Sequence, residues 1–404
     1  MSEKRWKWIT GDEDECPPTK NIGLRGVVVA DSNISRVDGE KGELIYRGYR
    51  IEDLAQQGTF EEIVHLLLFG ELPSADEYQA LKRSLADSRD LPGAVVDALR
   101  ASPTNAATMD VLQGMIPLLG AQDPDLTDES KEANRRKSLR LIARLGLVVA
   151  AWDRIRKGRG IVESRPELDH AANLLYTLHG ETPDPETARD LDVCLILHAD
   201  HSFNASTFTA RQIASTRAHI YACVAGAVGS LSGELHGGAN ARVYQMLREI
   251  GSADKVSDYV ARTLDEGGRI MGMGHAVYKV IDPRAKILGP MAERLGEATG
   301  RGELYELSEQ VRQVTAKEFK KRKDIEIHPN VDFYSASVYT MMGFDVDLFT
   351  PLFAVSRVAG WTAHVIEEKF AEAQQKPALY RPRAEYAGNY CGPEGCEWIP
   401  LDKR

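Results

Sequence analysis

The stretch Phe60-Glu61-Glu62-Ile63-Val64-His65-Leu66-Leu67-Leu68-Phe69-Gly70 has the pattern of an amphipathic helix. Its apolar side chains recur at spacings of three and four residues, which makes one face of the helix apolar. The residues on that face are Phe60, Ile63, Val64, Leu67 and Leu68. Gly70 predicts the end of this helix, because glycine readily adopts the left-handed conformation that closes many helices. Ser74 and Glu77 then form a capping box, which predicts the start of the next helix.

The same periodicity recurs outward from this stretch through most of the chain. It predicts further helices at about 138–156, 169–179, 187–199, 205–229, 240–250, 303–322 and 351–373. No alternation of strands and helices accompanies them, so the sequence predicts a mainly α protein. One short β element near the N-terminus is predicted from residues 27–29 and 44–46, which flank a segment rich in turn residues. The small residues at 222–229 predict close packing of a helix, either within the chain or between subunits.

The composition is that of a soluble globular protein with two or three domain-sized units. The chain has 404 residues, of which 43% are hydrophobic and 27% are charged. No stretch approaches the ~20 apolar residues of a membrane span. The N-terminus has neither the apolar core of a signal peptide nor the acid-poor, Arg-rich composition of a transit peptide. These features predict a cytoplasmic protein that does not enter a membrane.

The net charge and the cysteines indicate which ligands and which compartment fit the protein. A net charge of −10 argues against non-specific binding of nucleic acid, which needs a basic surface. Anionic substrates would therefore need positive charge that is concentrated locally. The cysteines are scattered and odd in number, which fits a reducing compartment and does not resemble a disulfide framework. They are Cys16, Cys194, Cys223, Cys391 and Cys396.

Three segments place a histidine in an unusual setting. They are His198-Ala199-Asp200-His201, Leu235-His236-Gly237-Gly238-Ala239-Asn240 and Gly272-Met273-Gly274-His275-Ala276-Val277-Tyr278-Lys279. In the last two, the histidine stands among glycines in a turn that we expect just before a helix. Glycine lets the backbone approach a ligand, and the N–H groups at a helix start favour anions and neutral imidazole. One such turn alone is more typical of a solvated histidine. Two together favour a site where neutral histidines donate hydrogen bonds to a carbonyl that becomes an enolate or alkoxide.

A carboxylate and several arginines are candidates for the same site. Asp332 stands among apolar and aromatic residues in Pro329-Asn330-Val331-Asp332-Phe333-Tyr334-Ser335. Partial burial there would make it a less solvated base than a surface aspartate, and the alternative is that it caps the following helix. Arginine suits the recognition of carboxylates, although any single arginine is more often a surface charge. The candidates are Arg284, Arg357, Arg381 and Arg383.

Parts of the sequence also fit two other classes of function. His198 and His201, with Asp200, suggest a metal site, because residues three apart on a helix share a face. No third ligand stands at a typical spacing, however, and His198 closes an apolar run that predicts burial. A non-catalytic helical scaffold is the other alternative, but it would not need histidine, arginine and aspartate in these settings.

Taken in order, these segments resemble the citrate synthase family in its shorter bacterial and archaeal form. The resemblance covers about residues 22–388 and includes Asp38-Gly39-Glu40-Lys41-Gly42 and Tyr46-Arg47-Gly48-Tyr49. Two positions depart from it: Ala276 stands where many relatives have arginine, and Ala107-Thr108-Met109 replaces a frequent His-Pro-Met.

The resemblance implies a mainly helical, two-domain homodimer. The large, dimer-forming domain would consist of residues 1–239 and 341–404, and the small domain, 240–340, would close over the active site. The implied reaction is the condensation of acetyl-CoA with oxaloacetate to citrate and free CoA. It requires no metal and no permanently bound cofactor, because acetyl-CoA is a co-substrate.

The resemblance also implies the roles of individual residues. Asp332 would take a proton from the acetyl-CoA methyl group, His236 would hydrogen-bond the thioester oxygen, and His275 would polarise the oxaloacetate carbonyl. The residues implied to hold the oxaloacetate carboxylates are His201, Arg284 and Arg357, with Arg381 reaching in from the partner subunit. Those implied to contact CoA are Gly272, Gly274 and Lys279. The basic run at 317–323 is a candidate for the CoA phosphates, although a solvated helix face is its more typical role.

The nearest alternative is a 2-methylcitrate synthase, which would use propionyl-CoA with the same residues. A pocket distinguishes one methylene by only about 1–3 kcal/mol, so the sequence leaves both substrates open.

Overall fold

The computed structural model describes residues 22–24, 26–388 and 395–404, and helices predominate in them. The strands are β1 (Ser35–Asp38), β2 (Glu43–Tyr46) and β3 (Tyr49–Arg50), which form one antiparallel sheet in that order. The short 3-10 helices are η1 (Ile22–Leu24), η2 (Ala253–Lys255), η3 (Val346–Leu348) and η4 (Leu401–Lys403). The predicted mainly α fold with a short N-terminal β element is therefore confirmed.

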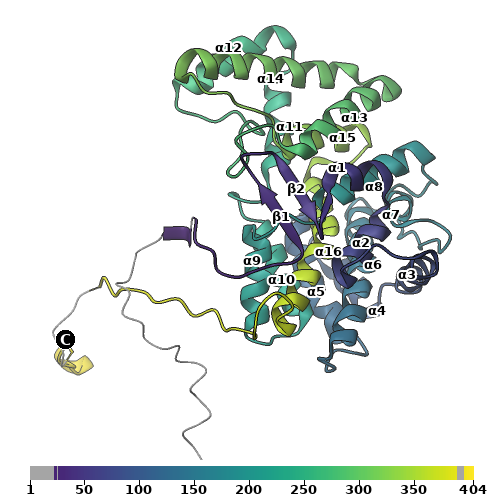
Figure 1. Ribbon diagram of the computed structural model, residues 1–404, viewed down its shortest axis with the longest axis vertical. Coiled ribbons are helices and arrows are strands. Elements are labelled where there is room, and N and C mark those ends of the chain that lie inside the picture. The colour runs from purple at the N-terminus through teal and green to yellow at the C-terminus, as the bar shows by residue number, and fades with distance from the viewer. Residues whose placement is uncertain (1–21, 25, 389–394) are drawn as a thin grey trace, which may run out of the picture.

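The α-helices fall into two groups, and the β1–β2 hairpin lies between them (Figure 1). The larger group, at the bottom of the view, comprises α1 (Ile51–Gln57), α2 (Phe60–Phe69), α3 (Ala75–Asp87), α4 (Gly93–Ala101), α5 (Thr108–Ala121), α6 (Lys131–Arg156), α7 (His170–His179), α8 (Pro185–His198), α9 (Ala205–Ser215), α10 (Ile220–Leu231) and α16 (Phe349–Phe370). The smaller group, at the top, comprises α11 (Ala239–Ile250), α12 (Val256–Asp265), α13 (Pro283–Thr299), α14 (Gly302–Lys323) and α15 (Val331–Met341). The domain boundaries near 240 and 340 stay a prediction.

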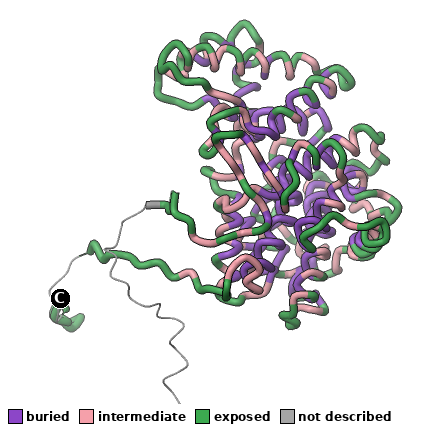
Figure 2. The backbone as a smooth tube through the Cα atoms, in the orientation of Figure 1, coloured by how far each residue is buried: buried purple, intermediate pink, exposed green. Residues whose placement is uncertain are grey.

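Helix α16 forms the centre of the larger group. It packs against α6, α9 and α10, and most of its side chains are buried (Figure 2). Trp361 is completely buried, and the charged side chain of Arg357 is almost completely buried. A charge is kept in a protein interior only where a partner or ligand compensates its desolvation, so Arg357 marks a place where an anion is expected.

The predicted helices are confirmed, with one exception. The segment 205–229 forms two helices, α9 and α10, instead of one. Between them Arg217 adopts a φ of 66°, and the His219 side chain caps α10 by accepting a hydrogen bond from Ala222 N. The apolar periodicity runs through this break, which is why the sequence predicted a single helix.

The sequence pattern missed six helices, namely α1, α4, α5, α12, α13 and α15. Two of them contain an internal proline, Pro117 in α5 and Pro290 in α13, and proline is normally a sign that a helix ends. The predicted strand at 27–29 is wrong. Val28 is 85% exposed there, and the partner of β2 is instead β1.

The small residues of 222–229 lie in α10 and pack within the chain. A Cβ atom on Gly226 would lie 2.2 Å from Ile213 Cδ1 of α9, and one on Gly229 would lie 2.5 Å from Gln113 Nε2 of α5. Both glycines therefore allow the helices to approach closely. Packing of this segment between subunits stays a prediction.

Two further features bear on the expectations from composition. In the part of the chain that the structure describes, no helix combines the length and apolar character needed to cross a membrane.

Cys194 and Cys223 are free and buried, whereas Cys396 is disulfide-bonded, a pairing that the scattered spacing did not predict.

Candidate active site

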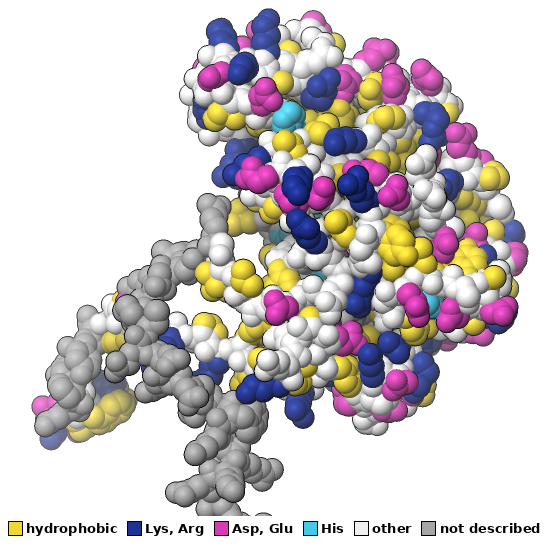
Figure 3. Space-filling model, viewed as in Figure 1, with side chains coloured by type: hydrophobic (Ala, Val, Ile, Leu, Met, Phe, Trp, Pro, Cys, Tyr) yellow, Lys and Arg dark blue, Asp and Glu magenta, His cyan; other side chains and the backbone are white. Residues whose placement is uncertain are grey.

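A cavity of about 640 Å³ lies where the two groups of helices meet, and it is lined by most of the predicted site residues. These are His201, His236, Gly274, His275, Arg284, Asp332 and Arg357. Arg269, which the sequence analysis did not single out, lines it too, so that three arginines face one aspartate. On the outer face in Figure 3, by contrast, basic and acidic side chains are mixed. The cavity is therefore a local concentration of positive charge, as anionic substrates would require.

The imidazole of His275 is held as a hydrogen-bond donor toward the cavity. Its Nδ1 accepts hydrogen bonds from the backbone N–H groups of Val277 and Tyr278, at 3.0 Å each. Burial, with a smaller contribution from Arg284, lowers the pKa of His275 to about 4. The ring is therefore neutral near pH 7, and because Nδ1 accepts, its proton is on Nε2.

The structure corrects the predicted setting of His275. No helix begins directly after it, because α13 starts only at Pro283. The two N–H groups of Val277 and Tyr278 replace a helix N-terminus, since they also point partial positive charge at the ring and disfavour its protonation. His236 conforms better to the prediction, because α11 starts at Ala239, three residues after it.

His236 carries its proton on the other ring nitrogen. Its Nε2 accepts a hydrogen bond from Ser206 N at 3.2 Å and lies 2.8 Å from Ser206 Oγ. Because a backbone N–H can only donate, Nε2 is an acceptor and the proton of the neutral ring is on Nδ1. Burial lowers the pKa of His236 to about 4, so this ring is also neutral near pH 7. The two histidines thus present opposite tautomers to the cavity.

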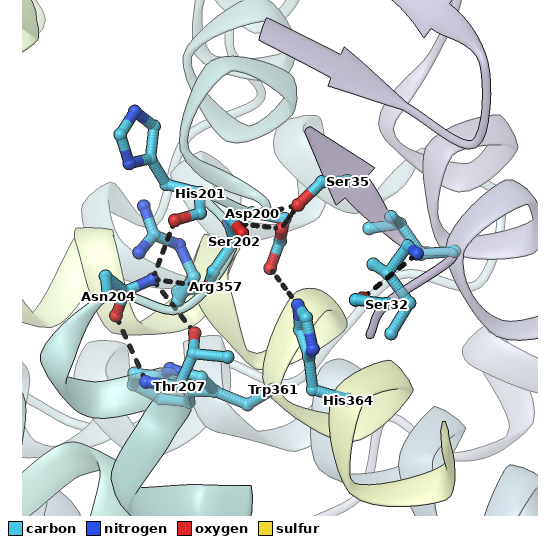
Figure 4. Close-up of polar contacts among 12 residues, drawn as sticks. Ser32, Ser35, Asp200, His201, Ser202, Asn204, Thr207, Arg357, Trp361 and His364 are labelled. Carbon is cyan, nitrogen blue, oxygen red and sulfur yellow. Dashed lines mark hydrogen bonds and ion pairs between the residues drawn. The ribbon is translucent and has the colours of Figure 1, made fainter. Parts of the chain in front are cut away.

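Ser206 is itself held in place by residues that the sequence analysis missed. Its Oγ accepts a hydrogen bond from Trp361 Nε1 at 3.1 Å and lies 2.8 Å from Asn204 Oδ1. Asn204 caps α9 by accepting from Thr207 N, as Figure 4 shows. The run Asn-Ala-Ser-Thr after His201 was a recognisable helix start, but nothing in the sequence linked it to His236.

Asp332 lies in the first turn of α15, where it is partly buried. The cap of this helix is Asn330, whose Oδ1 accepts from Asp332 N at 3.0 Å, so the alternative that Asp332 caps the helix is wrong. Desolvation raises the pKa of Asp332 to about 6, although Arg284 acts in the opposite direction. Such a carboxylate is a stronger base than a solvated one and is still mostly ionised at pH 7.

Asn330 also joins the glycine loop to the start of α15. Its backbone N donates to Gly272 O at 2.9 Å, and its Nδ2 donates to Gly274 O at 2.7 Å. Both glycines have positive φ, 75° and 83°, and a Cβ on Gly272 would lie 2.7 Å from Val243 Cγ2. Glycine is therefore required at 272 for backbone conformation and for space. These contacts hold the loop that carries His275 against the start of α15, and His275 and Asp332 line the same cavity.

Two arginines are positioned to receive carboxylates. The Arg284 guanidinium pairs with Asp282 (Nε–Oδ1 3.0 Å and Nη2–Oδ2 2.8 Å), and Asp282 Oδ2 also accepts from Val331 N at 3.2 Å. Arg357 donates from Nε to His198 O at 2.6 Å, while its buried Nη2 has no hydrogen-bond partner among the described residues. An unpaired buried guanidinium nitrogen is costly without a ligand, so this nitrogen points to an anion that binds here.

His201 completes the cavity wall between these groups. Its ring lies edge-on to that of His275, with centroids 5.5 Å apart, and its Nε2 lies 3.3 Å from Tyr278 Oη. Burial, with nearby Arg284, holds its pKa well below the ordinary value, so it is neutral. Asp200 supports the turn, since its carboxylate accepts from Ser202 N and from Ser35 Oγ (Figure 4).

Three predicted residues do not line this cavity. Arg381 is exposed on the extended C-terminal segment, and Lys279 forms an exposed ion pair with Glu40 at 2.5 Å. Gly272 lines a neighbouring cavity of about 460 Å³, to which Arg322 and Lys323 of the basic run also contribute. Arg269 lines both cavities, which therefore adjoin each other.

The structure does not support the metal hypothesis. Helix α8 ends at His198, so His201 lies beyond it and the two do not share a helical face. The His198 ring is buried, and its Nδ1 lies 2.7 Å from Cys194 O. Within the described residues, no group of three or more His, Cys, Asp or Glu side chains is arranged to hold a metal ion.

Comparison with known proteins assigns this arrangement to a family. The family model "Citrate synthase, C-terminal domain" matches residues 23–383. The citrate synthase of Haloferax volcanii is 43% identical to the chain, over 95% of the chain and 98% of the relative. The chain belongs to the citrate synthase family. Citrate synthases are acyltransferases that form a carbon–carbon bond, so the predicted enzyme class and function are confirmed.

Solved citrate synthases share the fold over nearly the whole length. The crystal structure from Pyrobaculum aerophilum matches with a TM-score of 0.87 at 38% identity, covering 95% of each chain. The structure from Thermoplasma acidophilum, a ternary complex with carboxymethyl coenzyme A and oxaloacetate, also matches with a TM-score of 0.87, at 30% identity over 96% of this chain and 100% of that one. A 2-methylcitrate synthase from Shewanella oneidensis is 37% identical over 91% of this chain and 94% of the relative.

Proposed function

We propose that this citrate synthase condenses acetyl-CoA with oxaloacetate in the cavity described above and releases citrate and CoA. The observation that carries the proposal is the convergence of two neutral histidines, which donate from opposite ring nitrogens, with one carboxylate of raised pKa. An acetyl thioester is a weak carbon acid, so a base alone cannot ionise it. A base together with a prepositioned donor to the enolate oxygen can.

In the first step the Asp332 carboxylate takes a proton from the methyl group of acetyl-CoA. The electron pair of the broken C–H bond forms the carbon–carbon double bond of the enolate, and the π pair of the carbonyl moves onto the thioester oxygen, to which His236 Nδ1–H donates a hydrogen bond. Because His236 is neutral before the step, its ring donates without having to lose a proton. Ser206 and Trp361 keep the ring in the tautomer that this step needs.

In the second step the enolate carbon attacks the keto carbon of oxaloacetate and forms the new carbon–carbon bond. His275 Nε2–H donates to the keto oxygen as it becomes an alkoxide, while His201, Arg284 and Arg357 hold the carboxylates. The alkoxide takes up one proton to give citryl-CoA, which balances the proton that Asp332 took from the methyl group and then releases. Water then hydrolyses the thioester of citryl-CoA to citrate and CoA. In this proposal Arg381 of a second copy completes the carboxylate site, so the active form is a homodimer.

The CoA moiety is proposed to extend from the catalytic cavity into the neighbouring one. Gly272 and Gly274 would let the backbone approach it closely, and Arg269, Arg322 and Lys323, which line the two cavities, would meet its phosphates. The exposed Lys279 would contribute from outside the cavities. Closure of the small domain, 240–340, over both substrates would exclude water during the attack. A cytoplasmic location fits this substrate pair.

The acyl group is best tested by thiol release with each substrate. We expect CoA release from acetyl-CoA that depends on oxaloacetate, with a higher kcat/KM than for propionyl-CoA. A preference for propionyl-CoA would instead assign the chain to the 2-methylcitrate synthases, two of which are 37% and 38% identical to it. Absence of CoA release with either substrate would contradict the proposed function.

The pH dependence follows from the raised pKa of Asp332. Because the base must be ionised, kcat/KM for acetyl-CoA should fall about tenfold per pH unit below the pKa near 6 and level off above it. His236 and His275, with pKa values of about 4, stay neutral over this range. Thiol release measured between about pH 5 and pH 8 tests this. Full activity at the low end would contradict the assignment of the base.

Replacement of Arg357 by lysine should weaken oxaloacetate binding. Lysine keeps the charge but loses the fork of donors, and a hydrogen bond to a charged group contributes about 1.5–3 kcal/mol, which corresponds to about 10- to 100-fold in KM for oxaloacetate. The KM for acetyl-CoA should change much less. The matched control is Arg83→Lys on the exposed face of α3, which should leave both values unchanged. An unaltered KM for oxaloacetate in Arg357→Lys would remove Arg357 from the site.

A further inference from the structure

The motif Asp38-Gly39-Glu40-Lys41-Gly42 has no role in the mechanism described so far, yet it lies against the loop that carries His275. It forms the connection between β1 and β2, in which Asp38 pairs with Glu43. Lys279 N donates to Gly39 O at 2.9 Å, and the Lys279 ammonium pairs with Glu40. Gly42 is buried in spite of its place at a hairpin tip. The tip is therefore docked onto residues 277–281.

Gly39 is glycine because of this docking and not because of its own backbone. Its φ lies outside the left-handed region, so a residue with a side chain could adopt the same conformation. The three nearest atoms to a Cβ built on it all belong to Val277: the carbonyl O at 2.1 Å, the carbonyl C at 2.8 Å and Cγ1 at 3.1 Å. Two of them are backbone atoms, which cannot turn aside as a flexible side chain can.

The peptides that the hairpin tip contacts are those that orient His275. Val277, whose carbonyl meets Gly39, donates its own N–H to His275 Nδ1, and Tyr278 N donates to the same atom. Lys279, the next residue, is bonded to Gly39 O. The hairpin tip thus contacts the backbone on both sides of Tyr278, at the Val277 carbonyl and at Lys279 N. This is the backbone whose N–H groups set the tautomer and the direction of the imidazole.

The base of the same hairpin supports the other histidine of the oxaloacetate site. Ser35 Oγ accepts from Ser202 N at 3.0 Å and donates to Asp200, which fixes the turn that follows His201 (Figure 4). Val37, between these two ends, lines the catalytic cavity. One short hairpin therefore spans from the His201 turn, in the larger group of helices, to the His275 loop, in the smaller group.

We propose that the β1–β2 hairpin tip is a positioning element for carbonyl polarisation, with Gly39 as the positioning residue that aligns His275 Nε2 with the keto oxygen of oxaloacetate. The proposal rests on the role of His275 given under the proposed function. A Cβ atom at residue 39 displaces the loop, and a displacement of about 1 Å at a catalytic group costs about 10²-fold in rate. Binding of the carboxylates depends on other residues and is expected to change little.

The test is Gly39→Ala, with oxaloacetate that carries ¹³C at the keto carbon. A hydrogen bond to the keto oxygen withdraws electron density and moves the ¹³C resonance downfield, in the binary complex and without any acetyl-CoA. We expect a clear downfield shift in the wild type, a loss of most of it in Gly39→Ala, and a kcat about 10²-fold lower with a KM for oxaloacetate within about threefold of the wild type. The control is Gly160→Ala, an exposed glycine whose Cβ would meet no atom within 4 Å, and it should behave as the wild type.

The outcomes separate the two proposals. If Gly39→Ala keeps the wild-type shift and kcat, the positioning role is overturned while the role of His275 stands. If the wild type binds oxaloacetate without any shift, the role of His275 fails and the positioning role fails with it.

A second variant covers the case in which Gly39→Ala does not fold. Glu40→Lys places a positive charge opposite Lys279 on the surface, where the backbone is untouched and folding is not at risk. The loss of an exposed ion pair corresponds to about a 1.5- to 5-fold change, so we expect kcat to fall by about that factor and the downfield ¹³C shift to be smaller than in the wild type. The charge swap Glu40→Lys with Lys279→Glu should restore the shift. An unchanged shift in Glu40→Lys would overturn the proposal.

Discussion

Replacement of Asp332 by asparagine is expected to lower kcat about 10³- to 10⁴-fold, near the upper end of what a general base contributes. Asparagine has the same shape but cannot accept the methyl proton, and the structure offers no other carboxylate in the catalytic cavity among its described lining residues. Oxaloacetate should still bind, because the arginines are intact. The measurements are steady-state thiol release and the binding of oxaloacetate by calorimetry.

The matched control for this variant is Asp258→Asn. Asp258 also lies in the first turn of a helix, α12, but it is exposed and does not line the catalytic cavity. It should keep wild-type kcat. If Asp332→Asn retained more than about a tenth of the activity, Asp332 would not be the base, since such a loss is too small for general base catalysis of this kind.

The same substitution is expected to stabilise the fold at neutral pH. The pKa of Asp332 rises from 3.8 to about 6 on folding, so between these values the folded state holds a proton that the unfolded state has lost. The wild type therefore loses stability as the pH rises through this interval, by about 3 kcal/mol at most, and asparagine avoids this cost. The difference in the free energy of unfolding between Asp332→Asn and the wild type should reach its maximum above pH 6 and vanish below about pH 4. An equal or lower thermal midpoint for Asp332→Asn at pH 7 would contradict the raised pKa.

The second large effect concerns the two histidines and tests their tautomers. The side-chain amide nitrogen of asparagine can occupy the place of Nδ1, and that of glutamine the place of Nε2. His236→Gln should lose the enolate donor and about 10²- to 10³-fold in kcat, while His236→Asn should lose less. For His275 the order reverses, so that His275→Asn is the severe change and His275→Gln the milder one.

The reversal is the decisive feature, because a general loss of packing would affect all four variants alike. Each pair differs by a single methylene at one position, so the asparagine and glutamine variants serve as controls for each other. We expect at least about a tenfold difference within each pair, in opposite directions. The same order at both positions would show that the tautomers differ from those set by Ser206 N and by the Val277 and Tyr278 N–H groups.

Several parts of the fold could be predicted from local sequence because their causes are local. The predicted capping box of Ser74 with Glu77 involves residues three apart, and the apolar stripe of α2 is visible in eleven residues of sequence. Other elements could not be predicted. Helix α13 continues through Pro290, and the break at Arg217 interrupts an apolar pattern, because tertiary packing outweighs local preference at both places.

The candidate site, like the fold, was predicted only in part. The sequence pointed to His236, His275 and Asp332 because glycine turns and an apolar setting are unusual for such side chains. It did not point to Ser206, Trp361 or Arg269, whose types are unremarkable by themselves. The contact between Trp361 and Ser206 joins residues 155 positions apart, and only the packing of α9 against α16 creates it.

The sequence by itself determined the helical class, the kinds of functional group and the family to which they belong, since these depend on residue type and on short spacings. The tertiary structure decided what those groups can do. It decided which nitrogen of each histidine holds the proton, because that depends on backbone N–H groups from Ser206, Val277 and Tyr278. It also decided that the Asp332 carboxyl has a raised pKa, because the folded chain removes water from around it.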